Sequence, residues 1–121
     1  MTVNGPSFIS IQVRDIQASA EFYETHLGFT RIAGPPNAVV FDTRPVSFAV
    51  REPAADFDPA RTPAPSGGVA VWMHATDIQQ IHDSLAAAGA EIVAAPFVSP
   101  FGLTFTFADP DGYRITLHDQ A

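Results

Sequence analysis

Apolar and polar residues alternate in short stretches along most of the chain, and this period of two predicts β-strands. In the last stretch, Tyr113, Ile115 and Leu117 fall on one face. That apolar face needs a core, whereas the opposite, polar face is left for solvent or a ligand. The expected strands are 8–13, 29–33, 37–42, 46–51, 69–74, 90–94, 103–107 and 113–118.

Two stretches change to a helical period and have typical helix ends. Asp15 and Asp77 are expected to cap the helices at their first turns, and Gly28 and Gly89 to end them. His26 and His82 lie on these helices and are expected to face solvent.

The order of these elements occurs twice, which predicts an internal duplication. Each copy contains a strand, a helix that ends at a glycine, and three further strands. One such copy needs the other copy to bury its sheet. We therefore expect an α+β fold in a single domain, 1–121. Two βαβββ modules would form a curved, cup-shaped mixed sheet with the helices outside. The expected parts are module one at 7–52, a linker at 53–68 and module two at 69–119.

Three connecting segments carry specific expectations. The Pro-rich stretch 53–68 is either a lid or a plain solvated linker, and the sequence leaves both open. Residues 95–102 are expected to form a loop, in which Phe97 and Phe101, with Phe57 of the Pro-rich stretch, are placed to close over the mouth of the cup. Asp109-Pro110-Asp111-Gly112 predicts a tight turn before the last strand, since proline presets φ and glycine accepts a positive φ.

Composition narrows the class of partner. The net charge of −7 argues against a nucleic-acid partner, which would need a basic patch. The absence of cysteine excludes disulfides, thiolate metal sites and a cysteine nucleophile. No signal peptide or membrane-spanning run is recognisable, so we expect a cytoplasmic protein without a membrane partner.

Several motifs together resemble the vicinal oxygen chelate superfamily, whose members include glyoxalase I, extradiol dioxygenases, fosfomycin-resistance enzymes and the bleomycin- and mitomycin-binding proteins. The resemblance covers nearly the whole chain and implies the duplicated fold, but a fold hosts many chemistries. It is carried by Val13, Asp15, Ile16, Ser19, Phe22 and Tyr23, by Leu27-Gly28-Phe29, by Ala87-Ala88-Gly89 and by Asp109-Pro110-Asp111-Gly112.

The resemblance also implies where a metal would bind, because enzymes of this superfamily hold a divalent ion with His and Glu from four strands. Here those positions fall on Phe8, Ala49, Ala70 and Thr116, which do not form a ligand set for such an ion. We therefore expect no metal and no cofactor. A displaced site built from His74 and His118, with Asp119 near them, is disfavoured because no carboxylate joins the two imidazoles with the right parity.

Strand parity gives an inventory of the concave face that does not depend on the resemblance. This face mixes aromatic surfaces for stacking with groups that form hydrogen bonds. Trp72 is expected to contact a ligand or an interface, whereas Arg51 and Arg114 are either ligand contacts or salt-bridged structural residues. The candidate ligand-binding residues are Phe8, Ser10, Gln12, Ser47, Ala49, Arg51, Ala70, Trp72, His74, Phe101, Thr104, Thr106, Arg114, Thr116 and His118.

These observations favour a metal-free protein that sequesters a bulky, partly aromatic antibiotic or natural product without changing it. The resemblance to the drug-binding branch implies a homodimer with pockets at the interface. One alternative is a lyase, isomerase or dioxygenase-like enzyme with a non-standard metal site or none, in which His74 or His118 would act as acid or base. Another is a small dimeric module with a metabolic ligand or a protein partner.

Overall fold

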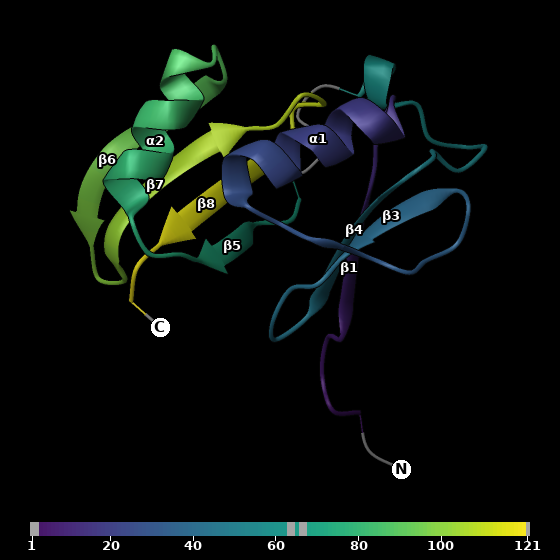
Figure 1. The fold of residues 1–121 in the computed structure, drawn as a ribbon, viewed down its shortest axis with the longest axis horizontal. Coiled ribbons are helices and arrows are strands. Elements are labelled where there is room, and N and C mark those ends of the chain that lie inside the picture. Colours follow the sequence, from purple (N-terminus) through teal and green to yellow (C-terminus); the bar gives the residue numbers. More distant parts are fainter. Residues whose placement is uncertain (1–2, 63–64, 66–67, 121) are drawn as a thin grey trace. The chain divides into compact units, whose positions relative to one another are not determined.

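The structure, a computed structural model, describes residues 3–62, 65 and 68–120, and the chain divides into two compact units, Met1–Arg61 and Thr62–Ala121. Each unit contains a four-stranded mixed sheet and one α-helix (Figure 1). This confirms the α+β class and the two βαβββ modules. The boundary between the units lies inside the Pro-rich stretch. A single domain and a cup built from both sheets stay predictions, and each unit is described by itself.

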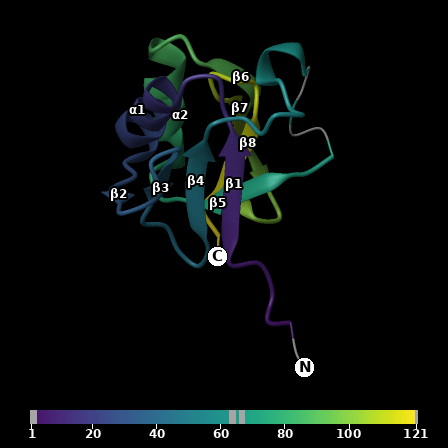
Figure 2. The same ribbon diagram turned by 90° about the vertical axis from the view of Figure 1, so that its right-hand side faces the viewer.

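The first unit forms a sheet in the strand order β1-β4-β3-β2. Strand β1 is parallel to β4, and the remaining neighbours are antiparallel (Figure 2). Its elements are β1 (Phe8–Gln12), α1 (Ile16–Leu27), β2 (Arg31–Ile32), β3 (Ala38–Phe41), β4 (Ser47–Arg51) and a 3-10 turn η1 (Pro59–Arg61).

Helix α1 covers one face of this sheet and buries an aromatic core against β3 and β4. The rings of Tyr23 and Phe48 lie 5.2 Å apart, edge to face, an arrangement that aromatic pairs prefer. Phe41 and Val50 are fully buried on the same side. The predicted caps of α1 are confirmed. Asp15 accepts hydrogen bonds from two backbone N–H groups of the first turn, and the left-handed Gly28 ends the helix.

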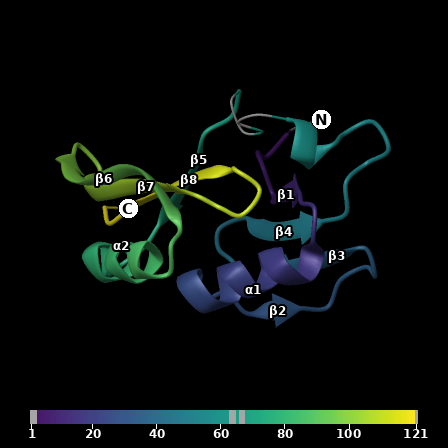
Figure 3. The same cartoon turned by 90° about the horizontal axis from the view of Figure 1, so that it is seen from above.

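The second unit repeats the arrangement, with the strand order β5-β8-β7-β6 and β5 parallel to β8. Helix α2 packs on β6 and β7 (Figure 3). Phe105, Phe107, Ile115 and Leu117 are buried on this side of the sheet. The elements are β5 (Val71–His74), α2 (Ile78–Ala87), β6 (Glu91–Ser99), β7 (Gly102–Ala108) and β8 (Arg114–His118).

The prediction of a loop at 95–102 is wrong. Strand β6 continues to Ser99 and forms a hairpin with β7. Pro96 is tolerated because β6 is an edge strand of the sheet, and because the pairing shifts register between Ala94 and Phe97. Phe97 is therefore part of a strand.

One of the two expectations about the ends of helix α2 needs correction. The helix begins at Ile78, but Asp77 has a φ of 54° and its side chain makes no capping hydrogen bond. The expected glycine stop is confirmed, since Gly89 has a φ of 83°. The N–H of Ala90 donates to the carbonyl of Leu85, as in a Schellman motif.

The two helical histidines are not the solvent-facing residues that we expected. His82 is 19% exposed, and its ring meets Phe105 edge-on at 5.4 Å. His26 packs its ring at 4.9 Å from Phe22, one turn earlier on α1, and its buried Nδ1 has no hydrogen-bond partner among the described residues. Both imidazoles therefore pack against aromatic neighbours and are only partly exposed.

Asp109 organises the predicted turn between β7 and β8. The residue is 5% exposed, and its Oδ1 accepts hydrogen bonds from the N–H groups of Asp111 and Tyr113 at 3.0 and 2.9 Å. The positive φ of Gly112, 90°, completes the turn. The carboxylate therefore satisfies backbone donors that the turn leaves without strand partners.

Replacing Asp109 by alanine is expected to lower the free energy of unfolding by about 1–3 kcal/mol, because two N–H groups lose their acceptor. Asp109→Asn keeps an acceptor oxygen and is expected to cost less. Urea unfolding measures both variants, with exposed Asp56→Ala as the control. Equal stability of Asp109→Ala and Asp56→Ala would contradict this role.

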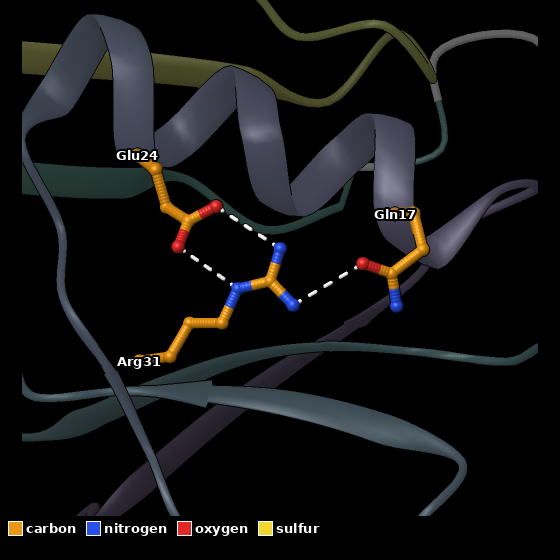
Figure 4. Close-up of polar contacts among 3 residues, drawn as sticks. All are labelled: Gln17, Glu24 and Arg31. Carbon is orange, nitrogen blue, oxygen red and sulfur yellow. Dashed lines mark hydrogen bonds and ion pairs between the residues drawn. The ribbon is translucent and has the colours of Figure 1, made fainter.

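Arg31 joins β2 to helix α1 through a bidentate ion pair (Figure 4). Its Nε and Nη2 donate to the two carboxylate oxygens of Glu24 at 2.8 and 3.0 Å, and Nη1 donates to Gln17 Oε1 at 3.2 Å. The register places Arg31 opposite Phe41, on the helix side of the sheet, so its guanidinium reaches α1. The hydrogen bond from Arg31 holds the pKa of Glu24 below its ordinary value.

The Glu24–Arg31 pair is expected to make stability depend on pH. Folding lowers the pKa of Glu24 from its ordinary value of 4.5, so the ion pair contributes fully to the free energy of unfolding above pH 4.5. It is lost as the pH falls through the lowered pKa of the folded chain. Melting temperatures should therefore show Glu24→Gln below the wild type at neutral pH, with the gap closing in acid. Glu52→Gln, at an exposed site outside the Glu24–Arg31 pair, is the control and should show no such closing gap. A constant gap in melting temperature for Glu24→Gln would refute the stabilising role of the pair.

Candidate functional site

The side of the second sheet away from α2 combines hydrogen-bonding and aromatic side chains. The register brings Trp72, Thr116 and Thr106 into one row across β5, β8 and β7. A second row contains His74, His118, Thr104 and Phe97. The parity inferred from the sequence for these strands is therefore confirmed. We call this surface the polar face of the second sheet.

Four rings gather at one end of the polar face and are called the aromatic cluster: Trp72, His74, Phe101 and His118. The ring of Trp72 lies 5.5 Å from Phe101, near perpendicular, and 5.7 Å from His118. The ring of His118 also lies 5.9 Å from His74 and 6.2 Å from Phe101. His118 is therefore the ring that all three others surround.

Much of the aromatic surface here is exposed. Trp72 is 47% exposed, Phe101 53%, and Phe97, on the neighbouring edge strand, 50%. These rings lie on the polar side of the sheet, whereas Phe105, Phe107, Ile115 and Leu117 on the opposite side are buried. Grouped apolar surface of this kind is typical of a ligand or partner site.

The β6–β7 turn fixes the position of Phe101. The N–H of Phe101 donates to Ser99 Oγ at 3.0 Å, and Ser99 Oγ lies 2.8 Å from the buried hydroxyl of Thr104. The turn is also tied to the residues after β8, because Leu103 N–H donates to Asp119 Oδ1 at 2.9 Å. Phe101 is therefore held in an ordered hairpin turn.

Thr106 and Thr116 form a hydroxyl pair beside Trp72. Their Oγ1 atoms lie 2.8 Å apart, on antiparallel neighbours β7 and β8. Both residues are only partly buried. Because each hydroxyl has one hydrogen and only one of the two is needed for the pair, the other remains to donate elsewhere.

The corresponding face of the first sheet carries the other predicted residues. The register places Phe8, Ser10 and Gln12 of β1 beside Ser47, Ala49 and Arg51 of β4.

The residues of this face differ in how exposed they are and in whether their side chains are already hydrogen-bonded. Phe8 is 51% exposed and Ala49 is buried. Gln12 Oε1 accepts a hydrogen bond from the backbone N–H of Ala54, and so holds the chain that follows β4. Arg51 forms no ion pair among the described residues, and its Nε donates to the carbonyl of Glu52 at 3.0 Å.

Two predicted residues lie at the margin of the second sheet. Ala70 precedes β5, which begins at Val71 and not at the expected residue 69. Arg114, the first residue of β8, is exposed and pairs with Ala108. The structure thus brings together Trp72, His74, Phe101, Thr104, Thr106, Thr116 and His118, and leaves Ala70 outside the strands.

The positions at which the superfamily holds a metal do not fit one here. The side chains of Phe8, Ala49 and Ala70 have no donor atom, and Thr116 Oγ1 is paired with Thr106. In the displaced alternative, Asp119 directs its Oδ1 to Leu103 N–H, and it forms no metal-ligand group with the two histidines among the described residues. Across residues 3–62, 65 and 68–120, no three His, Cys, Asp or Glu side chains are grouped so that they could hold an ion.

Sequence reasoning missed two residues that support the aromatic cluster, Ser99 and Asp119, which position the β6–β7 turn. Phe97 was expected in a loop over the mouth of the cup, whereas the structure places it in β6 on the polar face. The alternation Ile92, Ala94 stops at the proline, so strand parity alone did not extend to Phe97. Gly102, with a φ of 88°, was the available signal for a tight turn.

Gly102→Ala is expected to disturb the site through the β6–β7 turn. An added Cβ would lie 2.0 Å from Asp119 Oδ1, so that carboxylate must leave Leu103 N–H. The left-handed backbone adds a cost of about 1–2 kcal/mol. Unfolding should show lower stability, and Trp72 emission should shift in the folded protein. Gly68→Ala, where a Cβ meets nothing within 4 Å, is the control. Matching behaviour of the two variants would contradict the assigned role of the turn.

Comparisons with known proteins agree with this fold. A glyoxalase-related enzyme from Fulvimarina pelagi has a TM-score of 0.75 at 20% identity, over 98% of this chain and 89% of that chain. TnmS3, an antibiotic binding protein from Streptomyces sp. CB03234, has a TM-score of 0.74 at 20% identity, over 100% and 99%. A protein of unknown function from Agrobacterium tumefaciens has a TM-score of 0.77 at 22% identity, over 100% and 97%.

The search among curated proteins found no match. None of the helices in the described part of the chain is long and apolar enough to cross a membrane. The sequence matches the family described as Glyoxalase/Bleomycin resistance protein/Dioxygenase superfamily over residues 5–117, and the chain therefore belongs to that superfamily.

Proposed function

We propose that this protein binds a bulky, partly aromatic antibiotic or natural product without a metal and sequesters it unchanged. The observation that carries the proposal is the aromatic cluster on the polar face, where Trp72 and Phe101 meet edge to face while each stays about half exposed. Exposed rings in fixed positions offer stacking surface without a large ordering cost on binding.

Polar groups beside the cluster are suited to orient such a ligand. Thr106 and Thr116 supply a hydroxyl hydrogen, and His74 and His118 supply ring nitrogens. A mostly aromatic surface with a few hydrogen-bonding groups is the usual composition of a small-molecule site. Arg114 lies on the same face and adds a positive charge at its margin.

Sequestration fits the chemistry of the residues present. The donor set at the superfamily's metal positions does not suit a divalent ion, so the activity proposed here uses binding alone. The likeness to an antibiotic binding protein of Streptomyces supports this direction at the level of the fold. Resistance would follow because each folded chain removes one drug molecule from solution. The proposal keeps the homodimer and the cytoplasmic location expected from the sequence.

A screen of aromatic antibiotics by thermal shift, followed by calorimetric titration of any that bind, tests the proposal. Trp72→Ala is expected to weaken binding about tenfold, or about 1.4 kcal/mol, because the ligand loses its stacking partner. Val98→Ala is the matched control. Val98 is 84% exposed, but its pairing with Leu103 places it on the opposite parity of β6 and β7.

The bound compound is then recovered from the denatured protein, and its molecular mass is measured by mass spectrometry. Unchanged compound at one equivalent per chain supports sequestration. A chemically altered product would favour the enzymatic alternative, for which His118 is the natural base candidate. Equal affinity of Trp72→Ala and the wild type would refute the proposed site.

A further inference from the structure

The hydrogen bond of His118 fixes which of its ring nitrogens carries the proton. Nδ1 lies 2.8 Å from the backbone carbonyl oxygen of Gln120. A carbonyl oxygen only accepts hydrogen bonds, so Nδ1 must be the donor. In a neutral imidazole the second nitrogen then has no hydrogen and presents a lone pair. Nε2 of His118 is therefore a hydrogen-bond acceptor.

This acceptor has no hydrogen-bond partner in the described part of the chain. His118 makes no other hydrogen bond among the residues that the structure describes, and its ring is only partly buried. The ring centroids of Trp72, His74 and Phe101 lie within 6.2 Å of the centroid of the His118 ring. A ligand that stacks in the aromatic cluster would remove water from Nε2, and an acceptor that loses water without gaining a donor weakens binding.

The other polar groups nearby do not supply that donor. The hydroxyl of Thr104, which pairs with His118 in the register, lies 2.9 Å from the Gly102 carbonyl and 2.8 Å from Ser99 Oγ. The hydroxyls of Thr106 and Thr116 are paired with each other two residue pairs further along β7 and β8, and the hydrogen that this pair leaves over is not bonded to His118 in the described part of the chain. A donor on the ligand would therefore satisfy Nε2 once water is displaced.

We propose that the ligand of the polar face is a hydroxylated aromatic compound whose phenolic O–H donates to Nε2 of His118. The inference rests on the proposed function, because it assumes that an aromatic ring binds in the cluster. His118 is then the residue that selects phenols over ethers and over bare aromatic rings. Sites built to bond a hydroxyl group discriminate against analogues that lack it, since the site's own polar group is left unpaired.

Three simple probes test this selectivity: 4-phenylphenol, 4-methoxybiphenyl and biphenyl. The wild type is expected to bind 4-phenylphenol about tenfold more tightly than the other two. His118→Phe keeps an aromatic ring but has no nitrogen, so it should bind the phenol and the ether equally. Val98→Ala, the control on the opposite parity of β6, should retain the preference. Titrations followed by calorimetry or by Trp72 emission give the affinities.

The outcomes separate this inference from the proposed function. Equal binding of all three probes by the wild type overturns the inference and leaves aromatic binding intact. Failure of every probe and every aromatic antibiotic to bind removes both. A preference that survives in His118→Phe also overturns the inference. If that variant does not fold, ¹H–¹⁵N correlation spectra of the wild type decide the matter. A protonated Nδ1, and an Nε2 resonance that moves when 4-phenylphenol is added, support the inference. A protonated Nε2 or an unmoved resonance contradicts it.

Discussion

The two-residue alternation of the strands is the constraint on which the rest of the structure depends. Because a strand directs successive side chains to opposite faces, burying Phe105, Phe107, Ile115 and Leu117 beneath α2 leaves the residues between them on the other side. A shift of one residue would exchange the two faces. The polar face, with its aromatic cluster, is thus a direct consequence of how the core of the second unit is packed.

Hydrogen bonds at the turns between strands help to position the aromatic side chains on that face. The carboxylates of Asp109 and Asp119 both accept backbone N–H groups at strand ends, one in the β7–β8 turn and one beside the β6–β7 turn. These two carboxylates therefore help to hold the hairpins, and the exposed rings of the polar face remain as its main apolar contact surface.

Strand parity allowed much of the site to be predicted from the sequence. It placed Trp72, Thr106, Thr116 and His118 on one face correctly, because every one of them lies in a regular strand. It failed at Phe97, where an edge strand accommodates Pro96 through shifts in register, and at the supporting role of Ser99, which comes from a hydroxyl contact within a turn. The cap expected from Asp77 failed because its left-handed backbone does not bring the carboxylate to the helix N–H groups.

Binding of an aromatic molecule on the polar face of the second sheet is the proposal that most needs a direct test. The most direct measurement is a ¹H–¹⁵N chemical-shift titration of the protein with an aromatic ligand found by thermal shift. We expect the indole N–H of Trp72 and the amides of β5, β7 and β8 to respond first, while exposed amides of α2 do not. Perturbations confined to α2, or an unperturbed Trp72 indole at saturation, would contradict it.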